Sequence, residues 1–464
     1  MRSKIDPLLC RADVRHGLTE DSPQVSEAFV SRSDIFSWGR VTRQMQRVAT
    51  PRFVDQLPAL IDAAKESSLL AVGLRRSYGD SCLNELGDLI DMSRLDRIIA
   101  FDPLNGILRA EAGVGFSEIL QLIVPHGWFL PVTPGTRFVT LGGAIANDIH
   151  GKNHHAAGSF GRHVRALGLL RSDRGRLTLT PESDPALFTS TIGGLGLSGI
   201  IEWAEISLTK IESAYLEVDT RAFETLDDFW DLAETSAEKF THTIAWVDGL
   251  AHGEGLGRGI FWRANWSPYG FFDAPRDQTR LRVPADAPDF LLSRLSIGAF
   301  NTLYHRLQAR AGTRLRHYLR FFYPLDTIGD WNRLYGRDGL LQYQCVVPRT
   351  AEREAIRTLL ETVAADRQAS FLAMLKTFGD LPAPGLLSFA RAGTTLALDF
   401  PNRGEKTRAL LARLDAIVAD AGGALYPAKD GRMSHSMFRR SFPRWQDLQR
   451  DPLMSSDFWR RVAA

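Results

Sequence analysis

The chain has 464 residues, of which 44% are hydrophobic and 24% are charged, and its formal net charge is +2. This length exceeds a single hydrophobic core and predicts a globular protein of about two or three domains. The nearly balanced charge argues against a nucleic-acid-binding protein, because such proteins gain affinity from a strongly basic field.

The N-terminal segment, residues 1–35, is polar and weakly patterned, and we expect it to form a loose arm. Charged residues interrupt it too often for the apolar region of a signal peptide. No stretch has the ~18 uninterrupted apolar residues of a transmembrane helix. We therefore expect a cytoplasmic protein, or one that lies peripherally at the inner membrane. Three widely spaced cysteines without a CxxC pair argue against a thiolate zinc site or a disulfide framework.

Apolar segments separated by glycine and proline begin at residue 36. We expect a helix at 53–64, strands at 67–74, 89–91, 98–101, 107–112 and 200–208, and an amphipathic helix at 116–127. Residues 131–161 (PVTPGTRFVTLGGAIANDIHGKNHHAAGSFG) are rich in glycine and histidine and poor in charge. This composition favours a functional loop over a disordered one.

The second half of the chain, roughly 211–423, differs in composition and pattern, with many tryptophans and alternating strands. We expect strands at 340–348, 371–379 and 393–401, and helices at 352–366 and 406–423. The tail begins at residue 424. This change in composition and pattern predicts a second domain.

The segment GLRRSYGD at 73–80 follows an apolar strand directly. A loop bounded by glycines can direct several backbone N–H groups toward one anion, such as a pyrophosphate. An ordinary strand turn with two exposed arginines gives the same pattern. The segment lacks the GK[ST] ending of a Walker A loop.

A second glycine-rich segment, GGLGLSG at 193–199, contains the spacing GxGxxG. A dinucleotide-binding fingerprint needs a helix after the glycines, but the following residues, IIEWAEISL, predict a strand. The Rossmann interpretation therefore fails on context. A turn that lets the backbone approach a ligand closely remains open.

Four histidines lie within residues 150–163, in and after the segment DIHGKNHH at 148–155. Imidazole is a common metal ligand, but the HExxH pattern is absent and the glycines indicate a loop. A polar loop with satisfied histidines is one alternative, and an active-site loop that donates hydrogen bonds to an anion is another. We predict no metal site.

Two lysines stand in unusual surroundings. Lys429 lies in LYPAKD at 425–430, where a solvated surface charge is the ordinary explanation. Lys376 interrupts the apolar strand FLAMLKTFG, and a half-buried lysine needs a partner, for which phosphate is well suited.

Together and in this order, these motifs resemble the decaprenylphosphoryl-β-D-ribose 2'-oxidases. These are the FAD subunits of decaprenylphosphoryl-ribose 2'-epimerases, within the vanillyl-alcohol oxidase class of FAD-binding oxidoreductases. The resemblance covers nearly all of the chain from residue 36 onward. It also includes GGLGLSGII (193–201), WNRLYG (331–336), LQYQCVVP (341–348) and LDFP (398–401).

The resemblance implies an α+β fold with a two-part FAD-binding domain of the PCMH type. Residues 36–210 and 424–464 would form that domain, and an inserted antiparallel-sheet domain at 211–423 would bind the substrate. The resemblance places Lys429 beside the flavin and the reacting hydroxyl. It implies FAD contacts for Gly73, Arg76, Ser77, Tyr78, Gly79, Gly135, Thr140, Gly143, His150, Asn153, Ile201 and Tyr426. It implies substrate contacts for Lys152, Trp246, Tyr335, Gln342, Gln344 and Lys376.

The implied reaction is oxidation of the 2'-hydroxyl of a polyprenylphosphoryl-β-D-ribofuranose to the 2'-keto sugar. This is the first half of epimerisation to the arabinose form used in cell-wall biosynthesis. A short-chain NAD(P)H-dependent reductase would complete the epimerisation, and the lipid substrate implies peripheral contact with a membrane. Covalent members of the class carry a histidine in the first loop, where this chain has Tyr78, so the resemblance implies non-covalent FAD.

Two positions depart from the family pattern. Many relatives have a cysteine where this chain has Ala397, and Thr395 replaces a pocket asparagine. Both departures concern the substrate side of the site. An FAD-dependent alditol or aldonolactone oxidase acting on a soluble sugar is therefore the alternative, and a non-catalytic flavin or sugar-phosphate binding protein is a second one.

Overall fold

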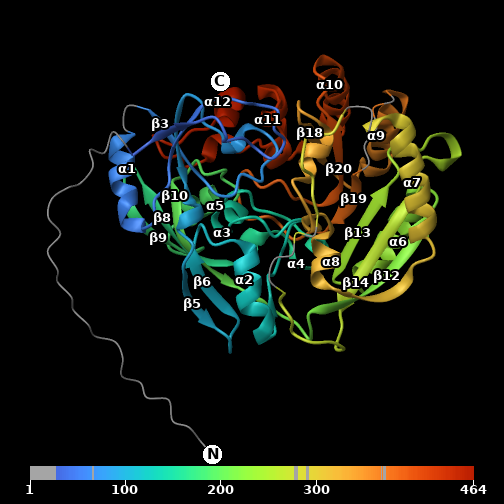
Figure 1. Cartoon of the computed structure of the whole chain (residues 1–464), viewed down its shortest axis with the longest axis horizontal. Coiled ribbons are helices and arrows are strands. Elements are labelled where there is room, and N and C mark those ends of the chain that lie inside the picture. The colour runs from blue at the N-terminus through green and yellow to red at the C-terminus, as the bar shows by residue number, and fades with distance from the viewer. Residues whose placement is uncertain are drawn as a thin grey trace, which may run out of the picture.

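The computed structural model describes residues 28–64, 67–275, 279, 281–288, 292–366, 368 and 372–463. Figure 1 shows two bodies, each with its own sheets and helices, side by side along the long axis of the molecule. The chain builds most of the first body, crosses to the second, and returns to the first with its C-terminal segment. The fold is α+β, as predicted.

Two sheets form the first body. The smaller sheet has the described strand order β1-β2-β4-β3, in which β4 pairs in parallel with both β2 and β3. The larger sheet has the order β5-β6-β10-β8-β9 and is antiparallel throughout. The strands of the two sheets are β1 (Val30–Arg32), β2 (Gln46–Ala49), β3 (Ser68–Val72), β4 (Gly87–Asp91), β5 (Ile98–Asp102), β6 (Ile107–Glu111), β8 (Val164–Arg171), β9 (Gly175–Leu179) and β10 (Ile200–Ser207).

Short helices surround these sheets, and a two-stranded ribbon lies beside them. The helices are α1 (Leu57–Ala63), α2 (Phe116–Ile123), α3 (Leu141–Ala146), α4 (His154–Ala157) and α5 (Pro185–Thr191), and the ribbon pairs β7 (Trp128–Phe129) with β11 (Thr209–Lys210). The α-helix predicted at 116–127 ends at Ile123 and continues as a 3-10 turn, because Pro125 cannot continue the α-helical hydrogen bonds and Gly127 adopts φ +80°.

The second body is built on an antiparallel sheet with the described order β16-β12-β14-β13-β19-β20-β18-β21. Helices α6, α9 and α10 pack on one face of this sheet through a continuous apolar core. The strands are β12 (Tyr215–Phe223), β13 (His242–Val247), β14 (Gly259–Trp266), β16 (Gly312–His317), β18 (Leu340–Val347), β19 (Ala373–Phe378), β20 (Gly393–Pro401) and β21 (Ala424–Leu425). The helices are α6 (Leu226–Ala237), α9 (Glu352–Asp366) and α10 (Glu405–Asp420).

The opposite face of that sheet is turned toward the first body. Helices α7 (Arg294–Gln308) and α8 (Tyr318–Phe322) lie on this side, together with the parallel pair β15 (Leu281–Arg282) and β17 (Ile328–Gly329). The aromatic side chains of Trp246 and Trp262 on the sheet pack against Tyr304 of α7. This face forms one wall of the site described below.

The C-terminal tail joins the two bodies. Strand β21 pairs with β18 of the second sheet, α11 (His435–Ser441) packs on β21 and α10, and α12 (Asp457–Ala463) packs on the turn at 80–82 of the first body. Leu69 of β3 exchanges backbone hydrogen bonds with Leu453 and Ser455, and Arg461 forms an ion pair with Asp80. The tail thus carries residues 426–431 into the space between the two bodies.

Two expectations about local structure were wrong. Residues 30–32 belong to β1, and Phe29 and Ile35 are buried, so the loose arm does not extend to residue 35. The remainder of the predicted arm, residues 1–27, lies outside the described residues. The region 131–161 contains α3 and α4 rather than loop alone. The domain boundaries at 210 and 423 remain predictions, although β21 extends the second sheet to residue 425. Within the described residues, no helix has the length and apolar character needed to cross a membrane.

Candidate active site

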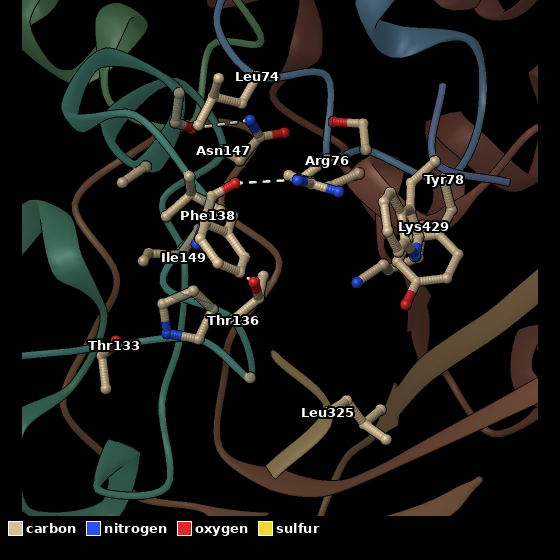
Figure 2. A pocket seen from close by; sticks show the side chains of 18 of the residues that line it. Leu74, Arg76, Tyr78, Thr133, Thr136, Phe138, Asn147, Ile149, Leu325 and Lys429 are labelled. Atoms are coloured by element: carbon tan, nitrogen blue, oxygen red, sulfur yellow. Dashed lines mark hydrogen bonds between the residues drawn. The ribbon is translucent and has the colours of Figure 1, made fainter. Parts of the chain in front are cut away.

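A cavity of about 880 Å³ lies where the two bodies meet, and the tail contributes to its wall. Figure 2 shows Arg76, Tyr78 and Lys429 on one side of it, with Phe138, Ile149 and Thr133 facing them. Its size is in the usual range of small-molecule and cofactor sites, ~300–1,000 Å³. Sixteen of the nineteen predicted site residues line it; Gly79, Asn153 and Tyr335 do not.

The loop after β3 has free backbone donors along the cavity. Arg75 adopts φ +50°, and the N–H groups of residues 74–77 donate no hydrogen bond to any protein group in the described part of the chain. Successive N–H groups around a left-handed residue form a concave site for an anion. The guanidinium of Arg76 stacks on Trp38 at 4.2 Å and donates to the carbonyl of Phe138. The loop is therefore held open for an anionic ligand such as a pyrophosphate.

The opposite wall is made of small residues. Thr140 caps α3 by accepting a hydrogen bond from the N–H of Gly143, and a Cβ on Gly73 would lie 2.1 Å from the Thr140 hydroxyl. A Cβ on Gly135 would meet no protein atom within 4 Å, so that backbone faces open cavity. These glycines leave room for a large planar or phosphorylated ligand to lie against the backbone.

Lys429 reaches the cavity from a 3-10 turn, Pro427–Lys429, at the end of β21. Its Nζ lies 3.9 Å from the centroid of the Tyr78 ring, and the N–H of Tyr78 donates to the carbonyl of Ala428. Burial lowers the pKa of Lys429 to about 8, against the opposing effect of Asp399. Part of the lysine is therefore a neutral amine near physiological pH, which is the state a proton acceptor needs.

Asp399 of β20 is a site residue that the sequence analysis did not single out. It is fully buried, accepts a hydrogen bond from Gln342, and interacts with the hydroxyl of Tyr335. Burial raises its pKa to about 6. The signal was available in the sequence, because Asp399 interrupts an apolar strand just as Lys376 does.

Lys376 and His150 form a second polar group on the cavity wall. The Nζ of Lys376 lies 3.1 Å from Nδ1 of His150, whose Nε2 lies 3.1 Å from the side-chain amide of Gln344. Burial, followed by the neighbouring charge of Lys429, lowers the pKa of Lys376 to about 7. Burial also lowers the pKa of His150 far below its ordinary value, so the imidazole is neutral.

Lys152 completes the group of buried lysines. Its Nζ donates to the carbonyls of Phe321 and Phe322, at 2.6 Å and 3.2 Å, and lies over both of their rings. Burial, followed by the charge of Lys376, lowers its pKa to about 7.

The described lining carries eight lysines and arginines against three aspartates. All three aspartates are already engaged: Asp326 accepts from the backbone N–H of Arg137, Asp330 pairs with Arg282, and Asp399 accepts from Gln342. The cavity therefore favours an anion, because a phosphate would restore the full charge of the buried lysines. Among the basic residues, Arg316 and Arg320 were not predicted, since nothing in their sequence context separates them from solvated arginines.

Three predicted residues lie behind the cavity wall and do not line it. The side chain of Asn153 donates to the carbonyl of Pro131, and Tyr335 packs behind Tyr78 in a small apolar cluster. A Cβ on Gly79 would lie 1.6 Å from the carbonyl oxygen of Asp430. These residues support the walls in this structure.

The four histidines are engaged separately. His150 belongs to the group described above. His155 and His163 contact backbone carbonyls, and His154 packs on the Phe378 ring at 4.4 Å. Within the described ranges, no group of three or more histidine, cysteine or acidic side chains is placed to hold a metal ion. The two departures from the family pattern, Thr395 and Ala397, both line the cavity, and the Thr395 hydroxyl accepts from Gln344.

Comparison with known proteins identifies relatives of the chain. Residues 45–181 match the FAD binding domain family. Decaprenylphosphoryl-beta-D-ribose oxidase of Mycolicibacterium smegmatis is 35% identical over 92% of this chain and 97% of its own length. An uncharacterized protein in the mprA 5' region of Streptomyces coelicolor is 34% identical, over 74% of this chain and 98% of its own. D-arabinono-1,4-lactone oxidase of Yarrowia lipolytica is 23% identical over 50% of this chain and 42% of its own.

Proposed function

The chain belongs to the family of FAD-dependent decaprenylphosphoryl-β-D-ribose oxidases, and on this premise we propose that it oxidises the 2'-hydroxyl of a polyprenylphosphoryl-β-D-ribofuranose to the 2'-keto sugar. The observation that carries the substrate class is the buried cluster of Lys152, Lys376 and Lys429 in one cavity. A neutral polyol or lactone would bring no anionic partner to Lys152 and Lys376, whereas Lys429 already has the carboxylate of Asp399. The lactone oxidase similarity also covers only half of the chain.

FAD is the cofactor, and it supplies the two-electron acceptor for the hydride that leaves the sugar carbon. We assign its pyrophosphate to the loop at 73–79, on the basis of the free N–H groups at 74–77. Because Tyr78 stands where covalent members of the class carry histidine, the cofactor is held by non-covalent contacts alone.

Lys429 takes the hydroxyl proton. As the C2'–H bond breaks, the O–H electron pair becomes the second bond of the carbonyl, and the proton passes to the neutral amine of Lys429. Asp399 then stabilises the ammonium that forms, because its negative charge raises the pKa of Lys429.

Lys376 and Lys152 bind the phosphate. Burial leaves each of them partly neutral, with a pKa of about 7, so an arriving phosphate favours their protonation and gains charge-assisted hydrogen bonds. Gln344 and Gln342 orient the sugar between the phosphate and Lys429. The product is a ketone still attached to its lipid, which a separate short-chain NAD(P)H-dependent reductase reduces to the arabinose form.

The test is an anaerobic mixing experiment. The purified holoprotein is mixed with a short-chain prenylphosphoryl-β-D-ribofuranose while the flavin absorbance is followed. We expect rapid bleaching with this compound and none with free ribose, alditols or aldonolactones. Bleaching by a free polyol or lactone, without bleaching by the phosphorylated lipid sugar, would reject the proposed substrate and retain the FAD-dependent oxidoreductase.

A further inference from the structure

Helix α7 has an unusual distribution of apolar side chains. Its inner side packs on the sheet through Ile297 and Tyr304. Its outer side exposes Leu295 (86%), Phe300 (48%), Leu303 (59%) and Leu307 (61%). Helical periodicity places these four side chains within one half of the helix circumference. In Figure 1, α7 forms an outer edge of the second body. We call this exposed side the α7 face.

The α7 face is also strongly basic. Arg306 lies on it between the leucines, according to the same periodicity, and Arg310 is exposed in the turn that follows the helix. Residues 290–325 contain six arginines and no aspartate or glutamate. Within the described part of the chain, none of these arginines forms an ion pair. The acids that contact this segment do so through other side chains: Glu224 and Asp273 lie near His305 and His317, and Asp248 and Asp219 accept hydrogen bonds from Asn301 and Thr313.

The α7 face adjoins the entrance to the cavity. Phe300 and Tyr304 of α7 line the cavity, and so do Arg316 and Arg320, which follow the helix in the chain. A row of basic residues therefore leads from the exposed helix toward Lys152, whose Nζ contacts the carbonyls of Phe321 and Phe322. A ligand that arrives at α7 meets the phosphate-binding lysines next.

We propose that the α7 face docks the protein on an anionic lipid bilayer, with the cavity entrance directed at the membrane surface. An apolar row of leucine and phenylalanine flanked by arginine is the pattern of helices that lie in the plane of a membrane interface. The absence of acidic residues from residues 290–325 fits a negatively charged surface better than a protein surface of mixed charge.

This inference deepens the proposed function and depends on it for its purpose. A polyprenyl chain stays in the hydrocarbon layer, because burying each CH₂ contributes ~0.8 kcal/mol. Docking through α7 lets the phosphoryl sugar enter the cavity while the lipid remains in place. Arg316 and Arg320 would meet the phosphate on the way.

The experiment is co-sedimentation of the full-length holoprotein with vesicles, either of pure phosphatidylcholine or of phosphatidylcholine containing phosphatidylglycerol. Two double variants test the face: Leu303→Gln with Leu307→Gln, and Arg306→Gln with Arg310→Gln. Leu104→Gln is the matched control, because Leu104 is 88% exposed in the turn between β5 and β6, far along the chain from α7. None of these residues lines the cavity.

We expect binding to the anionic vesicles and little to the neutral ones. The leucine pair should weaken binding on the order of ten-fold or more, because two apolar side chains lose their burial. Each arginine removed should weaken it about five-fold. Leu104→Gln should bind like the wild type. Bleaching by the short-chain soluble substrate should be unchanged in all variants, whereas turnover of a long-chain substrate in vesicles should fall with binding.

Three outcomes overturn the inference. The first is that the wild-type protein does not bind anionic vesicles. The second is that both double variants bind them as tightly as the wild type does. The third is that the wild-type protein forms a dimer and binds no vesicles, and that the double leucine variant is a monomer. The last result would assign the α7 face to a second copy of the chain. If vesicle binding behaves as expected but the soluble substrate fails to bleach the flavin, docking stands and the proposed substrate fails.

Discussion

Replacing Asp399 by asparagine isolates the electrostatic control of Lys429. Burial lowers the pKa of Lys429 to about 8, and the carboxylate of Asp399 opposes that decrease. At pH 7, roughly one-tenth of Lys429 is therefore the neutral amine. An opposite charge nearby typically shifts a pKa by ~1–3 units, so removing it should lower the pKa of Lys429 by about one unit or more.

The assay is the rate of flavin reduction by substrate, measured anaerobically across a pH series. In the wild type, the rate should rise with pH and reach half of its plateau near pH 8, because the lysine must lose its proton to act as a base. In Asp399→Asn, the half-maximum should move to more acidic pH by about one unit. At pH 7 roughly half of the lysine is then neutral, whereas the plateau rate should fall, because the ammonium that forms loses the carboxylate that stabilises it.

Tyr335→Phe is the matched control, because it removes a hydroxyl partner of Asp399 but keeps the charge of the carboxylate. Its half-maximal pH should stay close to that of the wild type. An unchanged or more alkaline half-maximum in Asp399→Asn would refute the electrostatic argument. A wild-type rate independent of pH between about 6 and 9 would refute Lys429 as the base.

Four further predictions follow from the cavity. Lys429→Met should retain FAD, but flavin reduction by substrate should slow about 10²- to 10⁴-fold in stopped-flow measurements. Lys376→Met should raise KM for the phosphorylated substrate about ten- to a hundred-fold in initial-rate assays, because it removes a charge-assisted hydrogen bond, while a phosphate-free analogue should be unaffected. A Cβ at position 135 meets no protein atom within 4 Å, so Gly135→Leu without cofactor should unfold at the same temperature as the wild type. Its side chain would enter the cofactor space, so its flavin-to-protein absorbance ratio should fall. Gly79→Ala would place its Cβ 1.6 Å from the Asp430 carbonyl and should lower unfolding stability by about 1–3 kcal/mol in calorimetry.

The regular elements of the second body could be predicted closely from sequence. Helix α9 and strand β20 occupy the predicted ranges, 352–366 and 393–401, because both have clear apolar periods and distinct ends. Helix α3 was missed because its sequence, LGGAIA, has small residues where an amphipathic helix has large ones. Those small residues let it approach Ala112 closely: a Cβ on Gly142 would lie 2.8 Å from the Ala112 side chain. Close backbone packing of this kind leaves no periodic signal.

The candidate site was predictable only in part. The family resemblance located both walls of the cavity, since most of the residues that it implies line it. It did not supply the interactions of Asp399 with Gln342 and Tyr335, because these pair side chains that are distant in sequence. The exposed apolar face of α7 was also missed. A sequence period shows that a helix has two sides, but the contacts of the folded chain decide which side is covered.

The hydrogen bonds between β21 and β18, and between Leu69 and the segment at 453–455, have a consequence for how the protein matures during synthesis. Lys429 and the other tail residues that line the cavity are synthesised long after the loop at 73–79. Until these residues are in place, the cavity formed by the loop at 73–79 and the large sheet lacks part of its wall. Closing contacts of such long sequence separation is slow relative to forming local helices. A nascent chain would thus lack the proposed proton acceptor until Lys429 has left the ribosome, and its cavity would stay incomplete until then.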